Sequence, residues 1–430
     1  MYIYIYSFVV YFFLISVFGC TDKSKKIETY NPPKIVGENI VESYFGKKIA
    51  DPYRNMENIK DSTLITWYKK QTDYSISILD KIPNRDLLID KLYEIDNRKS
   101  FYIRGNYTTE SNNRFYRKKN IGEQYYKLYY YDSKTNEEQI LFDPIIYKKE
   151  TEEVYTINYS KPSWDEKYVV VSLSHSGKEI SDLIIIETHT KRVLPVNLKN
   201  AWPNSFLGIN WLPDSSGFTY LYFPNSDSSE KDFKRNTQSV LYTIGQDPNT
   251  INYIFGNKTH SEYNITPIDY PSTKIKNVTD KYIIAYMAGV NNFWDAYYAK
   301  IEDIKSGKLN WYSLYKEKHK IKSSYGIVKD DDYYFITSKN SKNYEIASTS
   351  LLNPNFDKTN IIFTPPNDEV IKTFRVTKNA LYVTTSRLGI EAFLYEIIDG
   401  EATQIQLPKS SGRITLTSRS LTSNDIWVSL

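Results

Sequence analysis

The side chains that could serve as a nucleophile or a general base are few and scattered in this sequence. A serine hydrolase usually carries Gly-x-Ser-x-Gly, because its serine sits on a strained turn between a strand and a helix. The 430 residues contain no such motif. Two histidines flank expected strands and two lie in polar connections, where each is expected to be a hydrogen-bonded surface residue; they are His175, His189, His260 and His319. We therefore predict no catalytic residue in this chain.

The sequence also offers no clear set of ligands for a metal ion or a cofactor. One cysteine and four separated histidines form none of the spacings of zinc sites. Asp330–Asp332 lies at a predicted turn, where acidic residues are usually solvated, so a calcium site is the weaker interpretation. Asn291–Asp295 is either a binding loop or an aromatic residue packed beside a strand. We predict no metal and no cofactor.

The amino terminus predicts export. Met1–Gly19 carries no charged side chain and is long enough for a membrane anchor or for the apolar region of a signal. Val17-Phe18-Gly19-Cys20 resembles the lipobox of a bacterial lipoprotein, whose cysteine is lipidated and becomes the new amino terminus. Phe18 is bulky for that motif and no Lys or Arg precedes the apolar run, so an uncleaved anchor is the alternative.

Residues 1–20 are thus predicted to be a lipoprotein signal or a membrane anchor, with Cys20 as the candidate lipidation site. The polar residues 21–39 are typical of a flexible tether. Both interpretations place the folded part outside the cytoplasm, as a membrane-anchored protein of the periplasm or cell envelope.

Composition favours a soluble, strand-rich protein. Hydrophobic residues make up 40% and charged residues 25%, and 55 basic against 51 acidic residues leave a net charge of +4 without a basic stripe. Nothing here indicates nucleic-acid binding. Forty tyrosines and 19 phenylalanines against three methionines suit half-buried strands. With one cysteine no intrachain disulfide can form, so a hydrophobic core must supply the stability.

Two short amphipathic helices are expected between Asp61 and Arg98. Apolar residues recur there at spacings of three and four with charges between them, namely Leu64, Trp67, Ile76, Leu79, Leu87, Leu88, Leu92 and Ile95. The helices should be separated at Ile82–Arg85, because the residue before Pro83 disfavours helical dihedrals. We assign residues 40–98 to a helical amino-terminal segment.

From residue 99 to residue 430 the pattern alternates as in β-strands. Matching strands are expected near Arg114, Val169, Thr219, Ile283, Tyr334, Tyr382 and Trp427. Their spacing of roughly 45 to 65 residues is the repeat length of a propeller blade. The sequence predicts an all-β fold, a seven-bladed β-propeller with an incomplete last blade that starts at Arg413–Thr417 and ends with Asp425–Leu430. A pair of irregular β-sandwiches is the alternative.

Several segments, in the right order, resemble peptidases of the prolyl oligopeptidase family. Tyr44–Asn58, which reads YFGKKIADPYRNMEN, is similar to the opening Tyr-x-Gly and Asp-Pro-Tyr-Arg-Trp-Leu-Glu of that family, with Asn55 in place of the Trp. Further similar segments are Trp67 with Gln71, Leu79, Ile82–Arg85 and Leu88, then Asn120–Tyr125, Leu141–Pro144, Ser172–Glu179, Trp211–Tyr220 and Gly389–Ala392. The resemblance covers about residues 40–430 and is diffuse between 227 and 277.

The resemblance implies a propeller placed over an α/β-hydrolase domain, which admits only short peptides to a serine nucleophile that cleaves after proline. In that architecture the hydrolase follows the propeller. This chain would be the substrate-gating portion, the amino-terminal propeller type of that peptidase family, and inactive alone. Its expected partners are short proline-containing peptides and a separately encoded α/β-hydrolase domain, with no nucleic acid.

Two other functions remain open at this point. One is a stand-alone surface lipoprotein whose propeller binds a peptide or a glycan through the loops at one mouth. The other is a fragment of a receptor held in the membrane by an uncleaved anchor. The interpretation as the substrate-gating portion of a peptidase supposes that truncation or a split reading frame separates this chain from its hydrolase domain.

Overall fold

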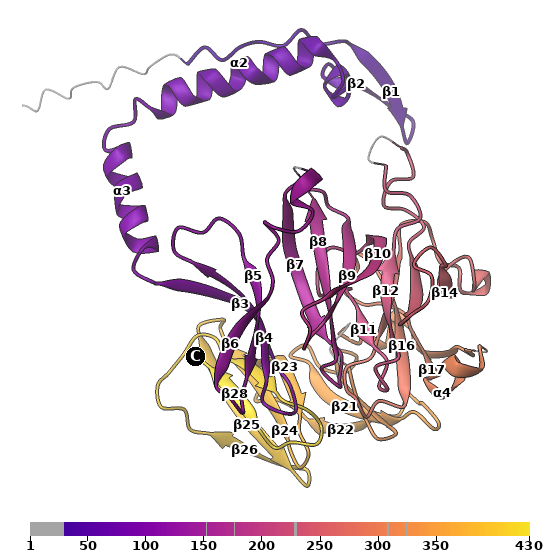
Figure 1. Ribbon diagram of the computed structural model, residues 1–430. Helices are drawn as coiled ribbons and strands as arrows, with labels where there is room; N and C mark the ends of the chain where they lie inside the picture. Colours follow the sequence, from indigo (N-terminus) through magenta and orange to yellow (C-terminus); the bar gives the residue numbers. More distant parts are fainter. Residues whose placement is uncertain (1–29, 152, 176, 228–229, 308, 323–325) are drawn as a thin grey trace, which may run out of the picture. The chain divides into compact units, whose positions relative to one another are not determined.

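A computed structural model describes residues 30–430 except 152, 176, 228–229, 308 and 323–325 (Figure 1). The chain divides into two compact units, one up to Arg98 and one from Lys99 onward. The first holds the long helices and a small hairpin. The second is built almost entirely of antiparallel sheets. The predicted all-β class with an amino-terminal helical segment is confirmed.

The first unit contains the two predicted helices. They are α2 (Ser62–Leu79) and α3 (Arg85–Asp96). Asp61 begins α2, because its carboxylate accepts hydrogen bonds from the main-chain amides of Thr63 and Leu64. The break falls where it was predicted: Asn84, next to Pro83, takes a left-handed conformation with φ of 62° directly before α3. This prediction is confirmed.

A β-hairpin precedes these helices, where the sequence analysis assigned residues 40–98 to a helical segment. Its strands are β1 (Ile40–Tyr44) and β2 (Lys47–Asp51), followed by the 3-10 turn η1 (Arg54–Glu57). Phe45 and Gly46 both have positive φ, 50° and 77°, which is the geometry of a tight two-residue hairpin turn. The description of 40–98 as helical is therefore wrong for residues 40–51.

Part of the predicted tether lies against α2. The carbonyl oxygen of Pro33 accepts hydrogen bonds from Trp67 Nε1 at 2.9 Å and from Gln71 Nε2 at 2.8 Å. Asn55 Nδ2 donates to the carbonyl oxygen of Val36 at 2.9 Å. Residues 33–36 are thus fixed by side chains of α2 and η1. The remainder of the tether up to residue 29 lies outside the described residues.

The second unit consists of repeated four-stranded antiparallel meanders. The first sheet is β3 (Phe101–Thr108), β4 (Arg114–Asn120), β5 (Lys127–Asp132) and β6 (Glu137–Phe142). Next come β7 (Tyr155–Pro162), β8 (Tyr168–His175), β9 (Ser181–Glu187) and β10 (Val193–Ala201), then β11 (Asn210–Trp211), β12 (Gly217–Tyr222), β13 (Gln238–Thr243) and β14 (Asn252–Phe255). These two groups form one eight-stranded sheet, yet only the pair Ala201 and Tyr222 joins them through β10 and β12.

The later sheets repeat the same order. They are β15 (Tyr270–Lys274), β16 (Tyr282–Ala288), β17 (Ala296–Lys300) and β18 (Tyr312–Tyr315); β19 (Ile327–Lys329), β20 (Asp332–Thr337), β21 (Glu345–Ser350) and β22 (Asn360–Phe363); and β23 (Glu369–Val376), β24 (Leu381–Arg387), β25 (Glu391–Ile398) and β26 (Glu401–Ile405). A two-stranded sheet, β27 (Thr415–Ser418) and β28 (Ile426–Ser429), follows. Short helical turns lie at η2 (Lys149–Thr151), η3 (Ser261–Tyr263), α4 (Glu302–Ser306) and η4 (Glu317–His319). This arrangement is consistent with the predicted six complete blades and a partial seventh.

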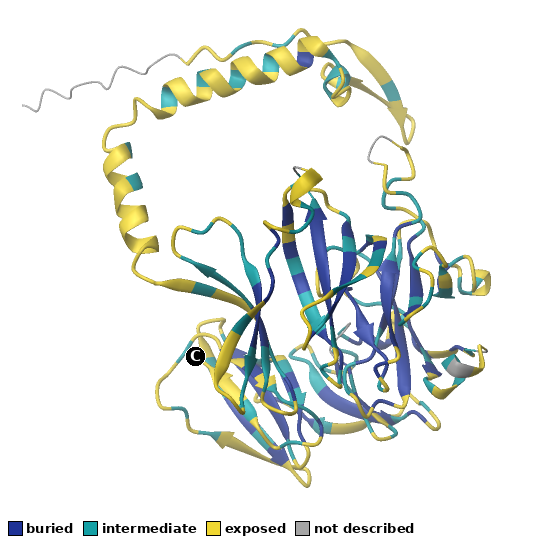
Figure 2. Ribbon diagram, viewed as in Figure 1, coloured by how far each residue is buried: buried dark blue, intermediate teal, exposed yellow. Residues whose placement is uncertain are grey.

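The sheets between the first and the last are covered on both faces by their neighbours, which is how such meanders bury a core. Strand β8 shows this directly, because Val169 and Val171 pack with Phe115 of the preceding sheet. Val170, on the opposite face, packs with Trp211 of the following sheet. Figure 2 shows these central strands as buried along much of their length.

Side chains also tie neighbouring sheets together along their inner edges, and we call these contacts seam bonds. In each, a side-chain nitrogen of one sheet donates to a main-chain carbonyl of the next. Five successive pairs of sheets are joined this way: Arg117 to Ile157 at 3.0 Å, Lys161 to Ile209 at 3.4 Å, Asn210 to Thr273 at 2.9 Å, Lys276 to Gly326 at 2.7 Å, and Lys329 to Lys378 at 2.7 Å. In four of these pairs both residues lie in, or within two residues of, the first strands of their sheets, whereas Arg117 comes from the second strand, β4.

We expect Val171→Ala to destabilise the protein by about 2 kcal/mol, because it removes two methyl groups from the packed interface between the first two sheets. Val171 is 0% exposed, whereas Val290 is 100% exposed and supplies a matched control. Urea unfolding followed by tryptophan fluorescence measures both variants. Equal losses for Val171→Ala and Val290→Ala would contradict the described packing.

Candidate functional site

Three of the four histidines occupy exposed or half-buried positions. His175 Nε2 lies 3.7 Å from Glu153 Oε1 at the rim of a cavity of about 610 Å³. That cavity is lined by both acidic and basic side chains, so it has no marked preference for one sign of charge. His189 is exposed in a turn, and His260 Nδ1 lies 2.8 Å from Thr259 Oγ1.

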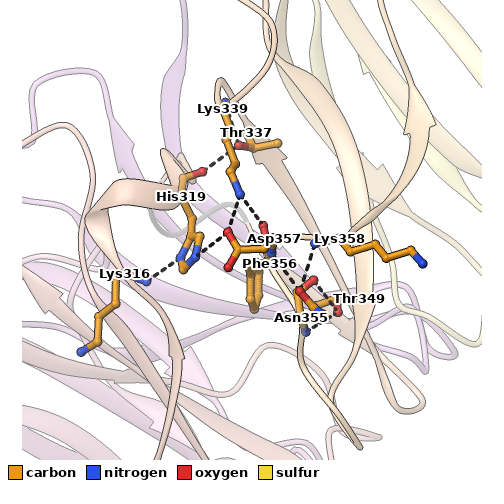
Figure 3. Close-up of polar contacts among 9 residues, drawn as sticks. All are labelled: Lys316, His319, Thr337, Lys339, Thr349, Asn355, Phe356, Asp357 and Lys358. Carbon is orange, nitrogen blue, oxygen red and sulfur yellow. Dashed lines mark hydrogen bonds and ion pairs between the residues drawn. The ribbon is translucent and has the colours of Figure 1, made fainter.

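His319 differs from its predicted surface position, since it is only 9% exposed. Figure 3 shows its ring between two partners: Nδ1 accepts from the Lys316 amide at 3.0 Å, and Nε2 lies 3.7 Å from Asp357 Oδ1. Lys339 Nζ in turn contacts Asp357 at 2.7 Å. Burial lowers the pKa of His319, which favours the neutral ring that can accept from the amide.

The hydroxyl groups around His319 are engaged with the main chain. Thr337 Oγ1 donates to the His319 carbonyl oxygen at 2.9 Å, and Thr349 Oγ1 accepts from the Asn355 amide at 3.0 Å (Figure 3). An imidazole that accepts from an amide and faces a carboxylate holds the end of η4 in place. It does not act on any hydroxyl shown in this cluster.

The acidic and aromatic segments singled out in the sequence make hydrogen bonds within the fold. Asp331 accepts from Lys281 Nζ at 3.2 Å and from Tyr282 Oη at 3.1 Å. Trp294 Nε1 donates to the Asn291 carbonyl oxygen at 2.9 Å, and Asp295 accepts from the Glu317 amide at 2.8 Å. Among the residues with described positions, no group of three or more His, Cys, Asp or Glu side chains is placed to hold a metal ion.

Cys20, the candidate lipidation site, and the whole of segment 1–20 lie outside the described residues. From residue 30 onward, with the gaps given above, no helix combines the length and the apolar character needed to cross a membrane.

A cavity on the inner strands is the strongest candidate for a functional site. It has a volume of about 430 Å³. Its walls come from β3, β7, the segment before β11, and the end of β15; the lining residues are Tyr107, Tyr159, Ser160, Lys161, Ser205, Phe206, Ile209, Asn210, Lys274, Ile275 and Lys276. The first strands of four successive sheets thus meet around one space.

Three lysines give this cavity its charge. Lys161 Nζ donates to the Ile209 carbonyl oxygen at 3.4 Å and Lys276 Nζ to that of Gly326 at 2.7 Å. Lys274 Nζ donates in the opposite direction, to the carbonyl oxygen of Phe206 in the segment before β11. None of the described residues that line the cavity carries a carboxylate.

Burial and mutual repulsion disfavour the charged form of these lysines. Burial lowers the pKa of Lys161 to about 8. Burial and then the charges of Lys161 and Lys276 lower the pKa of Lys274 to about 7. Burial and then the charge of Arg375 lower the pKa of Lys276 to about 8. Keeping these three lysines in their charged form inside the cavity therefore costs free energy.

Asp280 is the acidic group that opposes this charge most directly. Its carboxylate accepts from the main-chain amides of Lys276 and Asn277, at 2.8 and 3.1 Å, and from Asn277 Nδ2 at 3.1 Å. It favours the charged forms of Lys161 and Lys276. Burial raises the pKa of Asp280 itself. At the other side of the cavity, burial and then Glu110 and Glu166 raise the pKa of Tyr107 to about 12.

Local sequence patterns do not reveal this cavity. Basic residues are spread over the chain without a stripe, and each lysine taken alone is typical of the exposed end of a strand. A signal was present, because a basic residue lies at or near the end of the first strand of several repeats, at Lys161, Lys274, Lys329 and Arg375. These basic residues fall at matching positions only when the repeats are aligned by their first strands.

Comparisons with known proteins identify the relatives of this fold. The family model of the prolyl oligopeptidase N-terminal beta-propeller domain matches residues 32–428. The prolyl endopeptidases of Elizabethkingia miricola and Elizabethkingia meningoseptica are 24% and 25% identical over 329 and 323 residues, which are 75% and 73% of this chain. The chain spans 43% and 42% of the length of those two relatives.

Solved structures agree with the fold. A prolyl endopeptidase from a study of inter-domain dynamics in catalysis and specificity superposes with a TM-score of 0.77 at 18% identity, over 93% of this chain and 56% of that one. Prolyl oligopeptidase B from Galerina marginata, bound to a 35-residue hydrolysis and macrocyclization substrate, gives 0.76 at 18% identity, over 93% and 57%. The predicted propeller and the predicted family resemblance are confirmed.

The lowered lysine pKa values predict that stability rises with pH. Between the pKa of Lys274 in the folded protein and its usual value near 10, the unfolded chain binds more protons, so the free energy of unfolding increases with pH. We expect this increase between about pH 7 and 9, below the range in which tyrosines of the unfolded chain titrate.

Lys274→Met should reduce that slope by up to about 1 kcal/mol per pH unit, less where water in the cavity screens the charge. Urea unfolding at several pH values measures it. Lys358→Met is the control, because Lys358 is exposed and lies outside the residues that line the cavity. Identical slopes for the two variants would contradict the assignment.

Proposed function

The chain belongs to the prolyl oligopeptidase family through its N-terminal β-propeller domain, and we propose that this domain admits short proline-containing peptides to the catalytic centre of a serine endopeptidase. The observation that carries the proposal is the cavity formed where the first strands of four sheets meet. Its volume of about 430 Å³ falls in the range of small-ligand pockets, about 300–1,000 Å³. A few peptide residues fit such a space, and a folded protein does not.

Seam bonds support this gating role. They fix the first strands of successive sheets beside one another, and these strands form the cavity wall. Lys161 and Asn210 each contribute both to a seam bond and to the lining. The width of the passage is therefore set by the same contacts that hold the sheets in a ring.

The nucleophile is proposed to come from residues other than these 430, which contain no Gly-x-Ser-x-Gly. An α/β-hydrolase domain, encoded with this chain or separately, is the partner that the family relationship suggests. The alternative function is a lipoprotein whose propeller binds peptides or glycans without cleaving them. The observation that favours it is the combination of a missing nucleophile motif with Val17-Phe18-Gly19-Cys20 at the amino terminus.

The gating proposal is tested by joining this chain to the part of the Elizabethkingia meningoseptica prolyl endopeptidase that it does not cover. We expect the joined protein to hydrolyse a chromogenic Gly-Pro peptide and to spare Gly-Pro sites in a folded protein, because the propeller excludes bulky substrates. Labelling with a fluorophosphonate probe counts correctly folded nucleophiles. The chain alone is the control, and should release no chromophore.

Two results would count against this function. One is turnover by the chain alone that a serine-directed inhibitor blocks. The other is a joined protein that reacts with the probe yet cleaves the folded protein as readily as the short peptide.

We also propose that the protein is exported and held at the cell envelope by a lipid on Cys20. The support is the uncharged run Met1–Gly19 and the lipobox-like residues before the cysteine. Cells grown with labelled palmitate should incorporate label into the wild-type protein, and Cys20→Ser should abolish it. Export of Cys20→Ser with unchanged membrane retention would instead favour an uncleaved anchor.

A further inference from the structure

Positive charge in the central cavity exceeds what the seam bonds require. Asn210 makes a seam bond of 2.9 Å with a neutral amide, so a charge is not needed to join two sheets. Among the described residues, the hydrogen bond of the Lys274 ammonium group runs backward to Phe206 and not to the following sheet. Lys161 makes a long bond of 3.4 Å. A purely structural role leaves the charges of Lys161 and Lys274 unexplained.

These charges are costly to hold together. The ammonium groups of Lys161, Lys274 and Lys276 oppose one another, and Arg375 adds to the repulsion at Lys276. Asp280 offsets part of this, but its carboxylate is already bonded to the Lys276 amide and to Asn277. A bound anion between the lysines would remove the repulsion and gain charge-assisted hydrogen bonds.

The remaining lining residues are suited to more than a simple ion. Phe206, Ile209 and Ile275 provide apolar surface, while Ser160 and Ser205 provide hydroxyl groups. Tyr159, only 6% exposed, adds an aromatic ring to the same wall, with its hydroxyl buried beside the Ile209 main chain and Ser172. Mixed apolar and cationic surface matches a peptide segment that carries a carboxylate.

We propose that this cavity binds a carboxylate of a peptide, through Lys161, Lys274 and Lys276, and so makes acidic peptides the preferred cargo of the propeller. The preference for peptides over other anions rests on the proposed gating function. The carboxylate can belong to an Asp or Glu side chain or to the peptide's carboxyl terminus. Both present the same chemistry to the lysines.

Binding of four small fluorescent peptides to the purified full chain tests the proposal. The probes are 2-aminobenzoyl-Ala-Pro-Glu-Ala and its Gln counterpart, each with a free and with an amidated carboxyl terminus. Anisotropy is measured near pH 6.5, where lysines of lowered pKa are protonated. We expect each carboxylate to tighten binding by about tenfold, with an effect that weakens as salt is added.

Comparison of the four peptides distinguishes a side-chain carboxylate from the carboxylate of the carboxyl terminus. Preference for Glu over Gln in both amidated and free peptides assigns the site to acidic side chains. Preference that follows only the free terminus assigns it to the carboxyl end. Equal binding of all four peptides overturns the proposal, and so does equal competition by acetate and by an uncharged acetamide.

Single-residue variants test whether the preference for acidic peptides arises in this cavity. Lys274→Met should lose about tenfold of the preference for the acidic peptide, whereas Lys274→Arg should keep most of it because the charge remains. The exposed Lys358→Met is the matched control and should bind as wild type does. A loss in Lys358→Met equal to that in Lys274→Met contradicts the site. If Lys274→Met does not fold, the four-peptide comparison on the wild-type chain still decides.

This test is independent of catalysis. A chain that binds acidic peptides while the joined enzyme shows no size selection would overturn the gating function and leave the carboxylate site standing. Size selection by the joined enzyme without any preference among the four peptides would overturn the carboxylate site and leave the gating function standing.

Discussion

The seam bond from a side-chain nitrogen to a main-chain carbonyl of the next sheet is the contact on which the inner architecture depends. Antiparallel meanders of this kind satisfy their own strands but leave the first strand as an edge with unpaired main-chain groups. Arg117 and Asn210 each donate to a carbonyl of the neighbouring first strand, at Ile157 and Thr273, and Lys329 donates to Lys378 just beyond β23. The edges are thereby satisfied without merging the sheets, and the first strands become the wall of a shared cavity.

The same contact accounts for part of the basic character of the cavity, since Lys276 supplies a seam bond of 2.7 Å. A long side chain that must reach across to a neighbouring sheet is most simply a lysine or arginine, whose flexible stem packs along apolar surface while the nitrogen donates. Repetition of this solution at successive sheets concentrates cations around one axis. Lys161 and Lys276 are therefore both structural elements and sources of the field inside the cavity.

The abundance of tyrosine has a related cause. Tyr286, Tyr315 and Tyr333 are each almost fully buried between β16, β18 and β20. The hydroxyl groups of Tyr286 and Tyr333 lie 3.3 Å apart, and the rings of Tyr315 and Tyr333 are 6.2 Å apart. Tyrosine fills the broad space between two sheets and can still find a polar partner there. A chain rich in sheet-to-sheet interfaces uses it repeatedly.

The sequence predicted the repeating strands well, but it predicted poorly the features that depend on residues distant in sequence coming together. The strands expected near Val169 and Tyr382 are second strands of their sheets, and six residues of each are buried, which gives the apolar runs Val169–Val171 and Leu381–Val383. The hairpin at Ile40–Asp51 was missed because Phe45 is an unusual residue for positive φ. The burial of His319 and the meeting of the cavity lysines depend on contacts between residues distant in sequence, which no local pattern contains.

Joining sheets by isolated side-chain contacts has a mechanical consequence. At the inner rim two leaves share one or two side-chain hydrogen bonds, each worth roughly 1 kcal/mol, whereas between their faces they share a packed apolar interface such as Val171 against Phe115. Small openings therefore cost least at the rim, while separation of whole leaves would expose that interface to water. The junction of β10 with β12 carries a main-chain pair, Ala201 with Tyr222, and is therefore held more firmly than junctions joined by side chains alone.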